Sequence, residues 1–258
     1  MAKSVTAKSN TKGNNEAPLL EHLEELRNRI IISLIFLTLG TGVAWTYRIQ
    51  MLDWLKAPLA NVSAPVHIVA LRLTDQLLMS FTLSLWGGLI LALPFILHQV
   101  WLFVSPGLYP QERRWAVPFI VGAGFSFGLG VAFSYFVILP SMVKFLLDFL
   151  GGEVVNNLSI YDYVGQVVNI LLAMGVVFEL PILSFILTKI GVVNASLLSR
   201  VRKIAIIVIL VVAAVITPTT DPVNLMLVAV PIYLLYEIGI IVSRLAAPRE
   251  RRMLAQGE

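Results

Sequence analysis

The chain has 258 residues, of which 58% are hydrophobic and only 13% are charged, and it contains no cysteine. Globular proteins are about one quarter charged, so this chain has too few polar residues to cover a water-soluble fold, and much of its surface must contact lipid. This excludes soluble enzymes, disulfide-stapled secreted domains, disordered chains and thiolate metal sites. The composition predicts an all-α membrane protein.

Six apolar segments are candidates for membrane-spanning helices, each of which needs about 20 apolar residues. A polar cytoplasmic tail over 1–18 is expected to precede a single transmembrane domain over 19–245, and a basic cytoplasmic tail over 246–258 to follow it. Pro140 is expected to end the third helix. The predicted spans are 30–47, 77–104, 115–139, 163–188, 204–217 and 223–242.

The last two spans are expected to be short. Only 13 apolar residues, 204–216, lie between Lys203 and a turn-forming segment, and as a helix they reach roughly 20 Å. The hydrocarbon layer is about 30 Å thick. Pro231 and Glu237 interrupt the sixth segment. Two short neighbouring helices imply a thinned bilayer or partner helices beside them.

The distribution of lysine and arginine predicts the orientation, because these residues accumulate in cytoplasmic loops. With six spans, 15 of the 19 fall on one side, and the other side holds Arg48, Lys56, Arg72 and Lys144. Both termini are therefore expected in the cytoplasm. The two longest loops, 48–76 and 140–162, are expected outside.

Motifs for catalysis, nucleotides and metals give no support for an enzyme, and we expect no cofactor. Residues 124–128 match the G-x-S-x-G pattern of hydrolases, but inside an apolar segment and without a histidine. We interpret Gly124 and Gly128 as small residues for helix packing. Ser141 and Lys144 match S-x-x-K without its companion motifs, which fits a helix end with a snorkelling lysine. A peptidase using Ser126 is the third-ranked alternative.

Acidic residues on the cytoplasmic side suggest a ligand. An amphipathic segment before the first span presents acids first and bases second: Glu21, Glu24 and Glu25, then Arg27 and Arg29. Matching to the helix dipole explains this order equally well. However, Glu112 at the start of the third span is expected on the same side. Two carboxylates that each accept a bidentate guanidinium would select paired arginines, which lysine cannot imitate.

Glu179 is the one acid in the middle of a predicted span. An ionised carboxylate facing lipid costs about 2.5–3.5 kcal/mol on insertion scales, so this side chain should face protein or water. Proton coupling, a polar groove and a hydrogen bond between helices all remain open as its role. Pro181 follows closely, and Glu237 is expected to pair with Arg244.

Several stretches together resemble the TatC family, the polytopic subunit of the twin-arginine protein translocase. They are His22 to Arg29, Pro94 to Leu108 with Glu112 to Arg114, Phe133 to Phe136, Leu139 with Pro140, Gly175 to Pro181, and Pro231 to Gly239. The resemblance covers about 19 to 245. It implies a glove-shaped bundle of six helices that recognises signal peptides bearing two consecutive arginines and exports folded proteins across the cytoplasmic membrane, using the proton gradient.

The resemblance also implies roles for particular residues. They are signal-peptide binding for Glu25, Glu112, Phe103 and Arg27, a functional intramembrane acid at Glu179, outer-loop functions for Pro58 and Asp221, and contacts to partner subunits for Thr217 and Asn224. The implied partners are single-span subunits of the TatA and TatB type, within a multimeric receptor complex among membrane lipids. No nucleic acid is expected.

The alternative function is a proton-coupled carrier of small solutes that uses Glu179. Such carriers usually have repeated halves with interrupted helices at matching positions. The chain shows no such repeat, and its short predicted spans are consecutive.

Overall fold

The computed structural model describes residues 17–62, 65–105, 116–149, 151, 153, 155–217 and 221–246. Glu112 and both predicted tails beyond these bounds lie outside the described residues. The elements in chain order are α1 (Ala17–Thr46), α2 (Arg48–Lys56), η1 (Ala57–Asn61), β1 (Val66–Val69), α3 (Asp75–Val104), α4 (Ala116–Phe133), η4 (Ser134–Ile138), α5 (Leu139–Leu147), β2 (Asn156–Ser159), α6 (Ile160–Phe178), α7 (Leu180–Ile190), α8 (Ala195–Arg200), α9 (Arg202–Ile216) and α10 (Pro222–Ala246).

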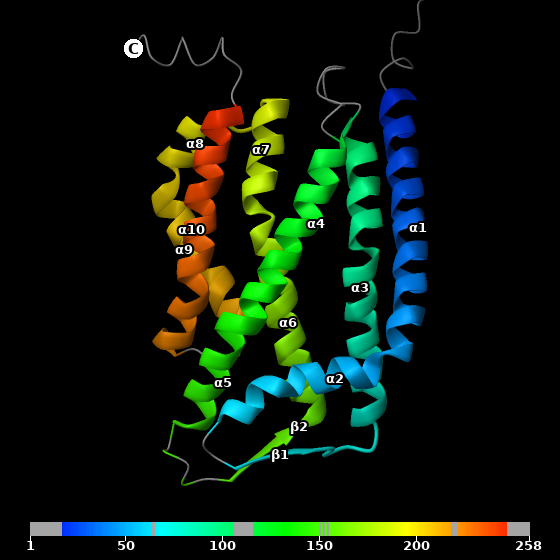
Figure 1. Cartoon of the computed structure of the whole chain (residues 1–258). Helices are drawn as coiled ribbons and strands as arrows, with labels where there is room; N and C mark the ends of the chain where they lie inside the picture. Colours follow the sequence, from blue (N-terminus) through cyan, green and yellow to red (C-terminus); the bar gives the residue numbers. More distant parts are fainter. Residues whose placement is uncertain are drawn as a thin grey trace, which may run out of the picture.

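Five helical stretches among the described residues are long and apolar enough to cross a membrane. They are His22–Thr46, Asp75–Phe103, Val117–Leu147, Ile160–Ile190 and Pro222–Ala246. The stretches run side by side, and the start of α1 and the end of α10 lie at the same end of the molecule (Figure 1). α9 has 15 residues and so reaches only roughly 22 Å, which agrees with the prediction of a short fifth helix.

The prediction that Pro140 ends the third helix is wrong. Helical structure continues through Pro140 to Leu147, and a π-helical turn, η4, immediately precedes α5. Proline lacks an N–H, and its ring collides with the carbonyl four residues earlier in a regular α-helix. The wider π turn changes the hydrogen-bonding pattern at this point, which lets the helix accommodate the proline.

The prediction of a short sixth helix is also wrong. α10 has 25 residues and runs continuously past Pro231. Glu237 does not interrupt it, because its carboxylate is held by Arg202 of α9 at 2.8 Å and by the Tyr233 hydroxyl at 2.9 Å. The prediction named Arg244 as the partner of Glu237. The charge of Arg244 acts on Glu237, but the short ion pair is the one with Arg202.

Two other helices differ in continuity from the predicted spans. The amphipathic segment at the N-terminus and the first span form one uninterrupted helix, α1. The fourth span is instead divided into α6 and α7 at Glu179. Pro181 lies in the first turn of α7, where its missing N–H is tolerated but where it cannot continue the hydrogen bonds of α6.

Elements of the two longest loops form a cap over one end of the bundle. α2 lies across this end (Figure 1), and its last carbonyls accept hydrogen bonds from two tyrosines: Tyr135 Oη to the Trp54 oxygen at 2.7 Å and Tyr163 Oη to the Leu55 oxygen at 2.6 Å. β1 and β2 pair in parallel, with Val66 opposite Asn156. The cap therefore connects segments from both long loops.

α6 forms much of the buried core. Its buried side chains include Val164, Val167, Ile170, Leu171 and Met174. α4 approaches it closely at Gly130, where a Cβ would lie 2.6 Å from the Met174 carbonyl oxygen. This close approach requires glycine, because no side chain fits there.

Candidate acidic site at the start of α1

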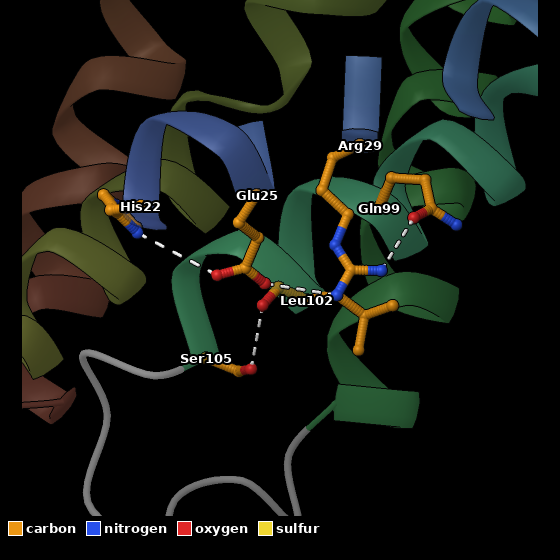
Figure 2. Close-up of polar contacts among 6 residues, drawn as sticks. All are labelled: His22, Glu25, Arg29, Gln99, Leu102 and Ser105. Atoms are coloured by element: carbon orange, nitrogen blue, oxygen red, sulfur yellow. Dashed lines mark hydrogen bonds and ion pairs between the residues drawn. The ribbon is translucent and has the colours of Figure 1, made fainter. Parts of the chain in front are cut away.

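The carboxylate of Glu25 lies in the N-terminal half of α1 and contacts a guanidinium of the same helix. Arg29 is four residues further on, which places both side chains on one face of α1. Its Nη2 donates a hydrogen bond to Glu25 Oε1 at 3.2 Å (Figure 2). The Glu25 side chain is 31% exposed, so solvent and a ligand can reach the carboxylate.

Gln99 of α3 holds the other side of the same guanidinium. Arg29 Nη1 donates to Gln99 Oε1 at 3.3 Å (Figure 2), and Gln99 is only 7% exposed. The Nε atom of Arg29 is buried and has no hydrogen-bond partner among the described residues. Arg29 therefore links α1 to α3 while part of its donor capacity is unused.

An aromatic pair borders the carboxylate. His22 Nδ1 lies 3.9 Å from Glu25 Oε2, which is beyond hydrogen-bonding distance. The imidazole ring stacks on Phe103 of α3, with ring centroids 4.4 Å apart and an angle of 16° between the planes. At the same end of α3, the Ser105 hydroxyl donates to the Leu102 carbonyl at 3.1 Å (Figure 2). Glu25 and Phe103 thus belong to one group, joined through His22.

Arg27, another predicted signal-peptide residue, does not join this group. Arg27 pairs with Glu24 at 3.2 Å, and each side chain is 65% exposed. Exposed pairs of this kind contribute little to stability. Glu112 lies outside the described residues. Its position relative to Glu25 remains a prediction.

Glu179 lies at the break between α6 and α7. Its Oε1 is buried and has no hydrogen-bond partner among the described residues. The carbonyl of the preceding residue, Phe178, accepts a hydrogen bond from the Ser126 hydroxyl of α4 at 2.7 Å. The expected packing role of Gly124 and Gly128 is not seen within the described residues of the chain, because a Cβ at either position would meet none of their atoms within 4 Å. Ser126 and Gly130 make the close contacts instead.

The predicted outer-loop and partner residues lie at the opposite end from Glu25. Pro58 is in the first turn of η1. Asp221 caps α10, accepting a hydrogen bond from the Asn224 backbone N–H at 2.8 Å and another from its side-chain amide at 2.9 Å. Thr217 and Asn224 are buried within the chain. A partner subunit would therefore reach the surface around these residues rather than their side chains.

Three residues of the acidic site were not predicted as site residues: His22, Arg29 and Gln99. The i,i+4 spacing of Glu25 and Arg29 is a visible signal for their pair. Gln99 is a lone amide within a long apolar run, which indicates a buried polar contact. Within the described ranges, no group of three or more acidic or histidine side chains could hold a metal ion.

Comparisons with known proteins agree with this structure. The family model described as "Sec-independent protein translocase protein (TatC)" matches residues 21–231. A protein of that name from Deinococcus radiodurans is 52% identical over 242 residues, covering 91% of this chain and 90% of the relative. One from Aquifex aeolicus is 37% identical and covers 92% and 98%. A crystal structure described as "Twin Arginine Translocase Receptor- TatC" superposes with a TM-score of 0.78 at 37% identity, covering 87% of this chain and 99% of that one.

Proposed function

Since the chain belongs to the TatC family of Sec-independent protein translocase proteins, we propose that it is the signal-peptide receptor of a twin-arginine translocase. Family membership makes it a multi-pass protein of the cytoplasmic membrane that takes part in protein transport and is not an enzyme. The proposal adds the ligand, a signal peptide with two consecutive arginines, and the residues that bind it: Glu25, Glu112, Phe103 and Arg27.

One observation carries the proposal. The Glu25 carboxylate accepts a guanidinium, that of Arg29, at a partly exposed position beside an aromatic side chain. The site is therefore suited in charge and shape to an arginine of a ligand. We propose that Glu112 supplies the second carboxylate.

The charges at the two ends of the molecule support a proposed orientation in the membrane. The end that carries the start of α1 also holds α8, the start of α9 and the end of α10, whereas α2, the start of α3 and the end of α5 lie at the opposite end (Figure 1). By their places in or beside these elements, Arg200, Arg202, Lys203 and Arg244 belong to the first end, and Arg48, Lys56, Arg72 and Lys144 to the second. Cytoplasmic ends are enriched in basic residues. We propose six spans, with α9 as the short fifth one, both termini in the cytoplasm, and a glove-like shape.

The exposed face of α9 is the proposed contact for single-span partners of the TatA and TatB type, within a multimeric complex. Ile207, Val211 and Val215 are exposed, Val215 to 81%. An apolar partner helix could cover this face and compensate for the short span. Thr217 and Asn224 would support this contact from beneath.

Glu179 is the proposed intramembrane acid through which the proton gradient could act. Its carboxylate is partly buried, and its Oε1 has no hydrogen-bond partner within the part of the chain that the structure describes. Glu179→Gln should fold normally and lower export; unchanged export would remove the acid from the mechanism. The family match favours a translocase over the carrier of small solutes. Among the described residues, no contact of Glu179 favours the carrier.

Binding of a fluorescent signal peptide to the purified protein tests the receptor function. Glu25→Gln and Glu112→Gln should each weaken binding of a twin-arginine peptide by at least about tenfold, as expected for loss of a charged hydrogen bond. Glu24→Gln is the matched control, because Glu24 is next to Glu25 in the chain but is 65% exposed and, among the described residues, pairs with Arg27. Equal binding by all variants would refute the proposed site.

A further inference from the structure

One side of α6 is exposed, and in the half of the helix next to α2 this side carries polar residues. The exposed residues of α6 are Asp162, Gln166, Asn169 and Val176. Their spacing places them along one line on the helix. α6 begins the apolar stretch Ile160–Ile190, which is long enough to span a membrane. We propose that water enters the membrane along the first three of these residues, the polar strip, from the end that α2 caps.

The depth of the polar strip follows from the contact between α6 and α2. Tyr163 Oη donates to the Leu55 oxygen of α2 at 2.6 Å, so the start of α6 lies at the level of α2. α2 begins at Arg48, directly after the apolar helix α1, and therefore marks the edge of the hydrocarbon layer. Asn169 is six residues beyond Tyr163, roughly 9 Å deeper. Its short side chain cannot reach back over this distance, as a lysine side chain could.

The two amides of the polar strip need hydrogen-bond partners. Within the described part of the chain, the side chains of Gln166 and Asn169 form no hydrogen bond. An amide has two donors and an acceptor, and leaving them unbonded in hydrocarbon costs free energy. Polar residues in membrane spans therefore face protein or water rather than lipid. Because both side chains are exposed, their partner must come from outside the described chain.

Water suits the polar strip better than a covering helix does. Asp162 is exposed in the first turn of α6, so the strip starts at a charged group and continues inward one turn at a time. At Gly165, an added Cβ would meet no described atom within 4 Å, which leaves open space beside Gln166. Water can bond to each group in turn. A covering helix would need a matching polar group at every level.

The polar strip ends at Asn169. The next fully exposed residue on this side is Val176, seven positions further, and it is 61% exposed. An apolar side chain offers water no hydrogen bond. We therefore expect hydrocarbon, and not water, around Val176, although it lies on the same line of the same helix.

The short helix α9 agrees with this depth. α9 packs against α6, and its 15 residues reach roughly 22 Å. Water that extends about 9 Å into a hydrocarbon layer of about 30 Å leaves about 21 Å of hydrocarbon. The two lengths agree, although one comes from the length of a helix and the other from the polar residues of its neighbour.

Cysteines placed along α6 test the proposal, since the chain has none of its own. The thiolate is the form that reacts with a maleimide, and a charged form is disfavoured in hydrocarbon. In membrane vesicles, a charged maleimide is added on the side from which it labels Leu73→Cys, a residue of the same end. Asn169→Cys should react at least about tenfold faster than Val176→Cys. Equal rates at the two positions overturn the proposal.

A pair of aspartate variants gives a second test. Asn169→Asp changes the shape of the side chain little and places a charge at the end of the polar strip, whereas Val176→Asp places one beyond it. The amount of folded protein in the membrane should stay within about twofold for Asn169→Asp and fall several-fold for Val176→Asp, because a charge that meets lipid opposes insertion. Gel filtration in detergent measures the folded amount. The proposal fails if both variants accumulate to the same level.

Purified protein in phosphatidylcholine vesicles distinguishes water from a partner helix. Asn169→Cys should react rapidly, relative to Leu73→Cys, both there and in vesicles made from cells. A rapid reaction of the purified protein with a slow one in cell vesicles would show that another membrane protein covers the polar strip, and would overturn the proposal. The proposal requires a chain that spans a membrane but not the receptor function. Signal-peptide binding tests the receptor function separately, so either proposal can fail without the other.

Discussion

The hydroxyl of Ser126 on α4 donates a hydrogen bond of 2.7 Å to the carbonyl oxygen of Phe178, the last residue of α6. This carbonyl lies beside the break that Pro181 imposes, and its own helix does not continue regularly past Glu179. In a membrane, a carbonyl near a break needs a partner within the protein. Ser126 supplies it, and its role is therefore structural.

Replacing Ser126 tests this role. Hydrogen bonds between membrane helices contribute about 0.6 kcal/mol on average and up to about 1.7. For a chain of this size such a loss corresponds to a fall in Tm of roughly 1–7 °C. We expect Ser126→Ala to show this fall in a thermal melt in detergent and to retain export. Complete loss of export at unchanged Tm would contradict a structural role. It would instead support the alternative that Ser126 acts as the nucleophile of the G-x-S-x-G motif.

Two glycines on α4 should respond differently to alanine. At Gly130 the added Cβ would lie 2.6 Å from a backbone oxygen of α6, whereas at Gly128 it would meet nothing within 4 Å. Overpacking of this kind costs roughly 1–3 kcal/mol. We expect Gly130→Ala to lower Tm clearly and Gly128→Ala to leave it unchanged or slightly raised. Similar melting of the two variants would show that α4 does not approach α6 as closely as described.

The tyrosines that hold α2 form another matched pair. Tyr163 is buried and Tyr135 is not, although both hydroxyls donate to carbonyls at the end of α2. Tyr163→Phe should cost about 1–3 kcal/mol, because it leaves a buried carbonyl unsatisfied. Tyr135→Phe should cost less, since water can replace its hydroxyl. Thermal melts of both variants check this order. A larger fall in Tm for Tyr135→Phe than for Tyr163→Phe would contradict the assignment of the stronger contribution to Tyr163.

The absence of cysteine from the chain allows a direct test of orientation. Leu73, before α3, and Val192, after α7, are both exposed and lie at opposite ends of the molecule. In intact cells, a maleimide that cannot cross the membrane should label Leu73→Cys and not Val192→Cys. Labelling should reach both after the cells are opened. The reverse pattern would invert the proposed topology.

Helix positions could largely be predicted from the sequence, but continuity could not. The apolar runs located α3, α9 and α10 to within a few residues, because lipid demands uninterrupted apolar segments. The effect of each proline depended on context. Pro181 coincides with a break, whereas Pro140 and Pro231 lie within helical structure. Whether a proline breaks a helix depends on neighbouring contacts and on local π turns, which no periodicity reveals.

In the acidic site, too, one residue could be predicted from the sequence and another could not. Glu25 could be identified because acids are rare in the chain and unusual near a membrane surface. The contribution of Gln99 could not, because it depends on how closely α1 packs against α3. That approach requires glycine at the contact: a Cβ on Gly40 would lie 2.6 Å from the Gly88 carbonyl oxygen. Contacts between helices that are distant in the sequence depend on such close packing, and the spacing of residues along the chain does not reveal them.

The pairing of β1 with β2 sets an order of events during biosynthesis. Val66 and its partner Asn156 belong to the two different long loops, and α3 and α4 lie between them in the chain. β1 therefore remains unpaired until the ribosome has delivered more than half of the chain. In the orientation proposed above, the second loop must also have crossed the membrane. The cap can close only then, so with the proposed topology a closed cap requires that α1, α3 and α4 have already inserted in the proposed direction.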